Sequence, residues 1–168
     1  MEIYLDHAAT TYVDDRVKEA MDKYFSDEYG NPGSFNTVGL RAKNAMDESR
    51  EKIAQILNCT TNEIIFTGSG TESINLAIKG FVKANKNKGN RIITQKTEHE
   101  AVLETCKYLE KEEDFKVTYL DVDEFGLIRL DELEKAITNE TILVSIMYAN
   151  NEIGTVQNIK EISGICKK

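Results

Sequence analysis

The sequence has one proline, no tryptophan and only two histidines among its 168 residues, so it is neither proline-rich nor fibrous. No stretch approaches the roughly 20 apolar residues that a membrane-spanning helix needs. The three cysteines are odd in number and form no Cys-x-x-Cys pair, which argues against a disulfide framework or a zinc site and favours a reducing cytoplasm. The N-terminal residues contain no basic segment followed by an apolar run, so we predict no signal peptide.

The charge balance is acidic. Twenty-one basic and 29 acidic residues give a formal charge of −8, which works against nucleic acid or an anionic membrane as the main partner. The one basic cluster, KANKNKGNR over residues 83–91, contains no aromatic residue and is typical of a solvated loop. With 40% apolar residues, the chain is long enough to form one domain with a substantial core.

Apolar periodicity predicts helices that alternate with short strands. The expected helices cover residues 14–25, 40–57, 71–84, 100–111, 130–137 and 158–167, and the expected strands cover residues 3–5, 63–66, 91–94, 116–120 and 141–147. A turn around Gly126 should follow the fourth strand. Strands joined by helical crossovers of this length predict an α/β fold with a mainly parallel sheet and helices on both faces.

The stretch EIIFTGSGTESINLAIKG contains a glycine-rich turn before a helix. Gly68 and Gly70 would let the backbone turn sharply, and the helix beginning near Thr71 would present free N–H groups, which are suited to phosphate. The hydroxyls of Thr71 and Ser73 would add donors. No Gly-Lys-Ser/Thr motif follows, and the spacing of a dinucleotide-binding loop fails. The alternative is a plain strand-to-helix turn with a threonine cap.

Two further polar turns are expected at the carboxyl ends of strands, where open α/β sheets bind ligands. His99, in TEHEAVL, could stack on a flat cofactor or move protons. The alternative is a helix-capping or exposed histidine. Asn150 and Asn151, in YANNEIGTVQNI, could hydrogen-bond a hydroxyl or phenolate, although asparagines are also common in turns.

Together these segments resemble the pyridoxal-phosphate-dependent cysteine desulfurases, which supply sulfur for iron–sulfur clusters and tRNA thiolation. The resemblance runs from residue 3 to the end and includes IYLDHAATT, YGNPGS, TEHEAVLETC, TILVSIMYANNEIGTVQNI and KEISGIC. It implies the fold type I transferase architecture of class-V aminotransferases, here the N-terminal half of the large domain. Residues 1–13 would form an N-terminal arm, and residues 14–168 would belong to the large, cofactor-binding domain.

The resemblance also implies roles for individual residues. Gly70 and Thr71 would hold the cofactor phosphate, His99 would stack over the pyridine ring and shuttle protons, and Asn151 would hydrogen-bond the phenolic oxygen, with Asn150 beside it as support. Asn31 would border the substrate pocket, or else be a turn residue before proline. His7, in the arm, would be structural, and many relatives have a histidine where this chain has Asn36.

Other parts of the family's machinery have no counterpart in this sequence. They are an aspartate at the pyridine nitrogen, a glutamine near the phenolate, the Schiff-base lysine of a Ser-x-His-Lys motif and the cysteine that takes the sulfur. Lys79 and Lys96 are expected to be solvated, and none of the three cysteines suits the persulfide role.

We therefore expect the N-terminal portion of a desulfurase that is inactive alone, in a cytoplasmic homodimer or hetero-oligomer. Its partners would be L-cysteine, a complementary C-terminal half or second subunit, and a sulfur acceptor such as an iron–sulfur scaffold. The alternatives are a non-catalytic partner that binds pyridoxal phosphate or another protein, and half of a selenocysteine lyase or other class-V aminotransferase.

Overall fold

The computed structural model describes residues 3–167, which fall into two compact units divided between Phe66 and Thr67. Residues 1, 2 and 168, which the predicted arm and large domain include, lie outside the described range. None of the helices within residues 3–167 has both the length and the apolar character that crossing a bilayer requires. The two units are described separately.

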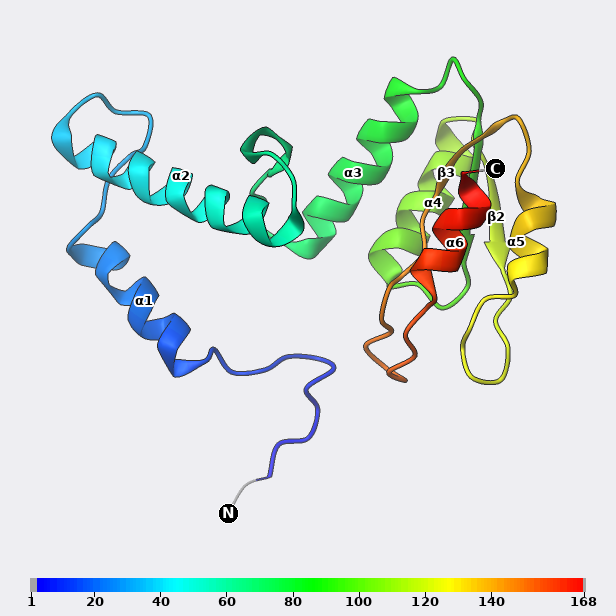
Figure 1. The fold of residues 1–168 in the computed structure, drawn as a ribbon, viewed down its shortest axis with the longest axis horizontal. Helices are drawn as coiled ribbons and strands as arrows, with labels where there is room; N and C mark the ends of the chain where they lie inside the picture. Colours follow the sequence, from blue (N-terminus) through cyan, green and yellow to red (C-terminus); the bar gives the residue numbers. More distant parts are fainter. Residues whose placement is uncertain (1–2, 168) are drawn as a thin grey trace. The chain divides into compact units, whose positions relative to one another are not determined.

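The first unit begins with an irregular segment and continues with two helices (Figure 1). Residues 3–14 contain only a turn, so the strand expected at 3–5 is wrong; no strand pairs with it, and Ile3 and Leu5 are 74% and 83% exposed. Helix α1, Asp15–Ser26, is capped by the Asp14 carboxylate, which accepts a hydrogen bond from the Arg16 N–H at 2.9 Å.

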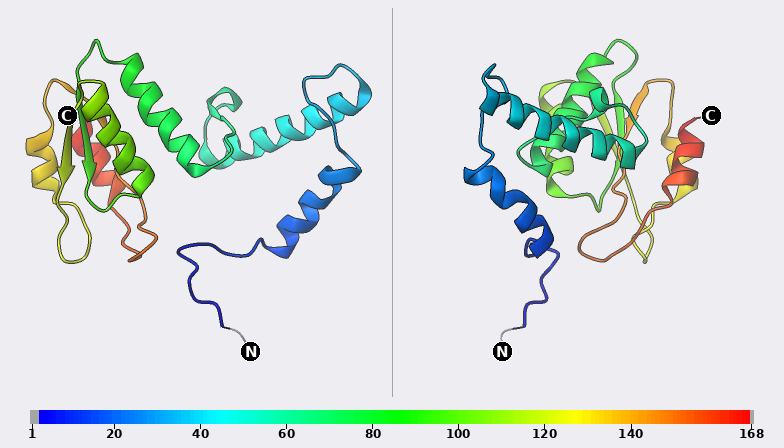
Figure 2. Two further views of the ribbon diagram at one scale, coloured as in Figure 1. Left: turned by 180° about the vertical axis from the view of Figure 1, so that it is seen from behind. Right: turned by 60° about the vertical axis from the view of Figure 1, so that its left-hand side comes forward.

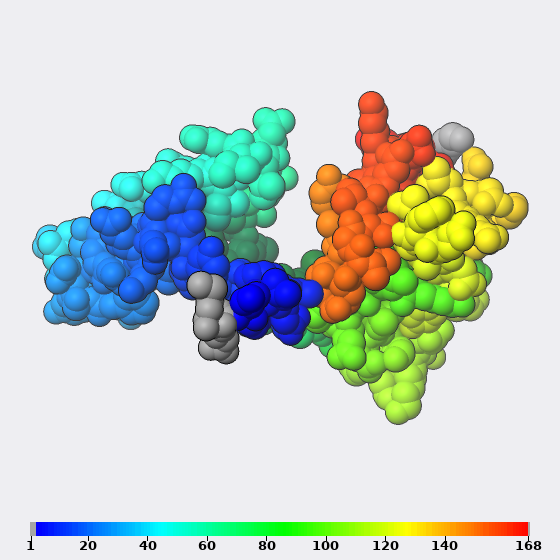
Figure 3. Space-filling model, turned by 90° about the horizontal axis from the view of Figure 1, so that it is seen from below, coloured from blue at the N-terminus to red at the C-terminus, as the bar shows by residue number. Residues whose placement is uncertain are grey.

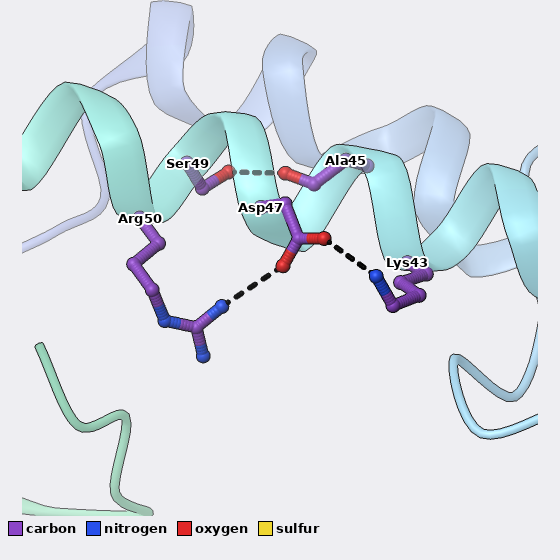
Figure 4. Close-up of polar contacts among 5 residues, drawn as sticks. All are labelled: Lys43, Ala45, Asp47, Ser49 and Arg50. Carbon is purple, nitrogen blue, oxygen red and sulfur yellow. Dashed lines mark hydrogen bonds and ion pairs between the residues drawn. The ribbon is translucent and has the colours of Figure 1, made fainter. Parts of the chain in front are cut away.

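Helix α2, Thr37–Leu57, starts three residues before its predicted start because Asn36 caps it by accepting the Gly39 N–H at 2.8 Å. On its exposed side, Asp47 pairs with Lys43 one turn before it and with Arg50 one turn after it, at 3.0 and 3.1 Å (Figure 4). The helix ends at a left-handed residue, Asn58, with φ of 52°.

The strand predicted over residues 63–66 is also wrong. A 3₁₀ turn, η1 (Thr61–Glu63), covers the first of these residues, and the residues from there to the glycine turn have no strand partner. The Glu63 carboxylate accepts both the backbone N–H and the hydroxyl of Thr60 at 2.8 Å. Those bonds hold the pKa of Glu63 below its usual value and favour the turn over an extended chain.

The second unit is a three-stranded parallel sheet of order β2-β1-β3 with two helices on each face, which confirms the predicted α/β architecture. Each strand pair is joined by a helical crossover, as parallel pairing requires. The strands are β1 (Arg91–Gln95), β2 (Lys116–Leu120) and β3 (Thr141–Val144). The helices are α3 (Gly70–Ala84), α4 (Glu100–Glu112), α5 (Leu130–Ala136) and α6 (Ile159–Cys166).

Two apolar cores lie on opposite faces of this sheet. Successive residues of a strand point to opposite faces, so Ile92 packs with α3 and α4 while Ile93 packs with α5 and α6. The right-hand view of Figure 2 shows α3 and α4, in green, on one side of the strands and α5 and α6, in yellow and red, on the other. Strand β3 ends at Val144, three residues earlier than predicted, because pairing with β1 stops at Ile93–Val144.

The loops after the three strands meet at the carboxyl edge of the sheet. The predicted turn at Gly126 is confirmed: its φ of +81° favours glycine, and an added Cβ would lie 2.7 Å from the Ile153 side chain. Gln157 bridges this turn and the segment after β3, donating to the Gly126 carbonyl at 2.7 Å and accepting the Ile128 N–H at 3.2 Å. Figure 3 shows the orange segment after β3 beside green residues of the same unit.

Candidate functional site

The glycine turn is closed by its own side chains. Ser69, which is the N-cap of α3, accepts the Glu72 N–H at 3.1 Å, and Glu72 accepts the Gly68 N–H at 2.7 Å. The helix therefore starts at Gly70, and the idea that Thr71 is its cap is wrong. The backbone bends at Gly68, as expected. Neither Gly68 nor Gly70 has a positive φ, so the turn does not need the left-handed conformation of glycine, and these capping bonds hold it.

Three donors remain at the start of α3. Within residues 3–167, no hydrogen bond uses the N–H groups of Gly70 and Thr71 or the Thr71 hydroxyl. The Ser73 hydroxyl is already engaged: Thr67 donates its one proton to the Ser69 carbonyl at 3.0 Å, so Ser73 must donate to Thr67 at 2.6 Å.

This donor set fits a phosphate. A Cβ added at Gly70 would meet nothing within 4 Å, so a ligand can approach the backbone there. The positive end of the helix dipole adds to the attraction for an anion. Of the two hydroxyls predicted to bind phosphate, Thr71 is free to do so, whereas Ser73 is used within the turn.

His99 caps α4, as one interpretation of the sequence held. Its Nδ1 accepts the Ala101 N–H at 3.0 Å, so the neutral ring carries its proton on Nε2. The residue is exposed. The capping bond therefore fixes the ring while leaving Nε2 and the ring face available to a ligand.

One cavity of about 400 Å³ between α3 and α4 is lined by both Thr71 and His99, so the second unit brings these two predicted site residues together. Asn75, Glu104 and Tyr108 contribute to the same lining. Thr71 offers a hydrogen-bond donor to an anion and His99 an aromatic face, which together suit a flat phosphorylated ring.

The two lysines considered above have partners. Lys79, at this cavity, is half-buried, with its ammonium 4.5 Å from the centroid of the Tyr108 ring, so it is not simply solvated as expected. Lys96, exposed after β1, pairs with Asp121 at 2.6 Å.

The two asparagines after β3 differ in their surroundings. Asn150 donates to the Thr97 carbonyl at 2.9 Å, and its side-chain oxygen accepts the N–H groups of Glu152 and Ile153 at 2.9 and 3.0 Å. Asn151 is exposed, and its amide donates to Glu152 at 3.0 Å. Asn150 therefore shapes the loop, while the role of Asn151 at a phenolic oxygen stays a prediction.

Glu98, directly before His99, was missed by the sequence reasoning. Its side chain is buried and accepts the Met147 N–H, which belongs to the segment after β3. Burial raises the pKa of the Glu98 carboxyl, against the lowering effect of the Met147 and Gln95 hydrogen bonds. An acid next to a candidate histidine is a weak sequence signal, because charged residues at helix starts are usually exposed.

The remaining candidates lie in the first unit and have local contacts. The Asn31 side chain accepts the Gly33 N–H at 2.9 Å, which is the turn arrangement foreseen as one alternative. His7 contacts Thr11, 3.1 Å from Nδ1, and the edge of the Tyr4 ring, with centroids 5.1 Å apart. These contacts are structural in character.

The cysteines are free. Cys106 is fully buried on α4, and burial raises its pKa to about 11, so its thiol stays protonated and a poor nucleophile at neutral pH. Desolvation also raises the pKa of Cys166. The expectation that none of the cysteines accepts sulfur stays a prediction.

Known proteins resemble the whole described chain. The family model for aminotransferase class-V matches residues 3–168. The cysteine desulfurase IscS of Clostridium botulinum (strain Hall) is 50% identical over 167 residues, which cover 99% of this chain and 42% of that relative. The structure of a NifS-like protein matches with a TM-score of 0.95 and 46% identity, covering 99% of this chain and 46% of that protein. SspA in complex with cysteine matches with a TM-score of 0.90 and 40% identity, covering 98% and 47%.

Proposed function

The chain belongs to the class-V aminotransferase family, and we propose that it is the N-terminal portion of a pyridoxal-phosphate-dependent cysteine desulfurase. Support comes from the similarity to IscS and to a NifS-like protein along nearly the whole chain. The chain spans about 42% of the length of the curated relatives it matches. The reaction, L-cysteine to L-alanine with transfer of the sulfur to an enzyme cysteine, therefore belongs to the proposal.

Class-V aminotransferases and their IscS- and NifS-like members depend on pyridoxal phosphate. When bound, this cofactor supplies an electron sink for bond changes at the substrate α-carbon. The observation that carries the proposal is the set of unused donors at Gly70 and Thr71, because Thr71 lines the same cavity as His99. These donors would hold the phosphate.

The other roles follow from the positions of the side chains. His99, fixed through Nδ1, would cover the pyridine ring and exchange the proton at Nε2. Asn151 would donate its exposed amide to the phenolic oxygen. Asn150 would hold the conformation of the loop that carries Asn151, because its side chain forms three hydrogen bonds with backbone groups.

The chain alone would not turn over cysteine. Neither histidine is followed by lysine, so the sequence contains no Ser-x-His-Lys motif, and the buried Cys106 is a poor nucleophile. We propose that the following portion of the longer relatives, supplied in the same or another polypeptide, completes the site. Within the described residues the outer edge of β3 is unpaired, and a groove of about 410 Å³ lined by Ile142, Val144, Ile162 and Cys166 runs beside it.

The wider assignments follow from the same similarity. We propose a homodimer or hetero-oligomer with L-cysteine as the substrate, which the cysteine complex of the related SspA supports. A sulfur-acceptor protein, such as an iron–sulfur scaffold, would take the product sulfur. The three free cysteines support a reducing, cytoplasmic setting.

The phosphate site is tested with two variants on the same helical turn. Thr71→Val removes the unused hydroxyl with little change of shape, whereas Ser73→Ala removes a hydroxyl that is already hydrogen-bonded to Thr67. A hydrogen bond to a charged group contributes about 1.5–3 kcal/mol, so Thr71→Val should weaken pyridoxal phosphate binding about tenfold or more. Ser73→Ala should bind nearly as the wild type does. Equilibrium dialysis against the cofactor measures both.

Complementation separates the desulfurase from its alternatives. The chain is co-expressed with the remaining portion of the Clostridium botulinum relative, and alanine and sulfide are measured with L-cysteine and a thiol reductant. Alanine formation only with both polypeptides supports the proposal. Cofactor binding without alanine formation points to the non-catalytic partner, and preference for selenocysteine points to a lyase.

In the binding experiment with Thr71→Val and Ser73→Ala, equal cofactor affinity of Thr71→Val and the wild type would refute the phosphate site.

A further inference from the structure

Within residues 3–167, Glu98 is the only buried acidic residue, with 9% of the residue exposed. It forms no ion pair within residues 3–167. Its Oε1 instead accepts the backbone N–H of Met147, a residue 49 positions further along the chain. A buried carboxylate that is held by a backbone N–H from another loop needs a reason, because burying it without a cationic partner is costly.

The location of this bond gives the reason. The parallel ladder between β1 and β3 ends at Ile93–Val144, followed by one more backbone bond from Ser145 N–H to the Ile93 carbonyl at 2.8 Å. Beyond that point, side chains join the segment after β1 to the segment after β3. Glu98 accepts from Met147 on the far loop, and Asn150 donates back to the Thr97 carbonyl at 2.9 Å.

These two bonds run in opposite directions between the same two loops. The first loop continues directly into His99, and the second continues into Asn151. A backbone N–H bonded to a carboxylate makes a stronger link than one bonded to a neutral oxygen. The pair therefore sets the spacing between the two loops where the sheet no longer does so.

We propose that Glu98 is a positioning residue, whose carboxylate ties the loop that carries His99 to the loop that carries Asn151. The inference rests on the proposed function, because it is there that these two residues face one cofactor. Glu98 itself is buried and is not a lining residue of the cavity between α3 and α4.

Three substitutions separate this role from mere filling of the interior. Glu98→Asp keeps the charge but is shorter by one methylene, about 1.5 Å, so it should not reach Met147. Glu98→Gln keeps an acceptor oxygen at the same reach. The Gln95 side chain, which donates to the Glu98 carboxylate, can turn its amide over and present its unpartnered Oε1 to the new amide. Glu112→Gln, at the exposed end of α4, is the matched control for loss of a carboxylate.

Hydrogen exchange on the full chain without cofactor provides the first readout. Glu98→Asp should lower the protection of the Met147 N–H by about tenfold to a hundredfold, as expected for loss of a hydrogen bond to a charged group. The amides of β1 should keep their protection, and Glu112→Gln should resemble the wild type. Glu98→Gln, which keeps an acceptor at the same reach but loses the charge, should fall between the wild type and Glu98→Asp. Unchanged protection in Glu98→Asp would overturn the proposal, and so would a loss spread evenly over the sheet.

Pyridoxal phosphate affinity provides the second readout. Glu98→Asp should bind the cofactor more weakly than Glu98→Gln does, although only the former keeps the charge. If Glu98→Asp lost the Met147 hydrogen bond but bound the cofactor as tightly as Glu98→Gln, the tie between the two loops would have no effect on the cofactor site, and that part of the proposal would be overturned. If the wild type bound no cofactor but Glu98→Asp still lost the protection of the Met147 N–H, the proposed function would fail, whereas the tie between the two loops would be supported.

Discussion

The two units of the chain contain similar amphipathic helices, but only the second unit buries their apolar faces. Of the described residues 3–66, only Gly39 and Ala54 are buried, whereas the second unit builds two apolar cores around its sheet. Helix α1 buries none of its residues, and the apolar stripe of Val17, Met21 and Tyr24 is 43–49% exposed. On α3, apolar residues of the same spacing, Ile78 and Val82, are 6% and 0% exposed.

The difference shows what an amphipathic pattern does and does not determine. The pattern predicts that a helix forms and which face is apolar, but burial needs a second surface. The sheet supplies that surface to α3 and α4, whereas within residues 3–167 the stripe of α1 remains 43–49% exposed. The exposed apolar side chains of the first unit, which include Tyr12, Phe25 and Phe35, are therefore suited to contact with further polypeptide.

The largest expected effect is a contrast in core substitutions. Leu133→Ala removes a fully buried side chain of the second unit and should lower the free energy of unfolding by about 2–5 kcal/mol. Phe35→Ala removes a side chain that is 97% exposed in the first unit and should change the free energy of unfolding by less than about 0.5 kcal/mol. Urea denaturation measures both. A large loss for Phe35→Ala would break the comparison, because it would mean that Phe35 is covered in solution.

The cysteines give the next contrast. Folding keeps the Cys106 thiol neutral, with a pKa raised by burial from 9.0 to about 11. This contributes about 2–3 kcal/mol of stability that is fully present below the unfolded pKa and is lost as the pH rises through the folded pKa. Stability of the second unit should therefore fall between about pH 9 and pH 11.

Alkylation gives the corresponding measurement at a single pH. At about pH 8, iodoacetamide should label the half-buried Cys59 of the first unit in the native protein, and Cys106 only after unfolding. Mass spectrometry of peptides identifies the sites. Native labelling of Cys106 at the rate of Cys59 would contradict its burial, and Cys106→Ala should flatten the alkaline loss of stability.

The sequence predicted the second unit better than the first for a physical reason. Strand β2 was predicted at its observed bounds, and the helices that cover the sheet within one or two residues, because there periodicity and packing agree. The strands expected at 3–5 and 63–66 failed because apolar residues extend only when a neighbouring strand pairs with them. Ile65 has no such neighbour and is 69% exposed.

The candidate site was predictable in its residue types but not in its internal bonds. The turn at Gly70 and Thr71 and the histidine at position 99 were found from their places before helices, and one cavity joins Thr71 and His99. The sequence did not reveal that Ser69 is the cap, that Ser73 is used by Thr67, or that Glu98 reaches Met147. Those bonds depend on how loops approach one another, and local propensity carries no such information.

The smallest expected effect concerns the exposed ion pairs of α2. Asp47→Asn weakens the pairs with Lys43 and Arg50, which are partly solvated, and should cost about 0.3–0.5 kcal/mol of helix stability at low salt. Circular dichroism during thermal unfolding at low and high salt measures it, since added salt screens such pairs. Ser49→Ala is the control on the same helix, because it removes only a hydroxyl bonded to the Ala45 carbonyl at 2.8 Å. If Asp47→Asn cost several times more and ignored salt, these pairs would be buried in solution, and the first unit would have a covered surface after all.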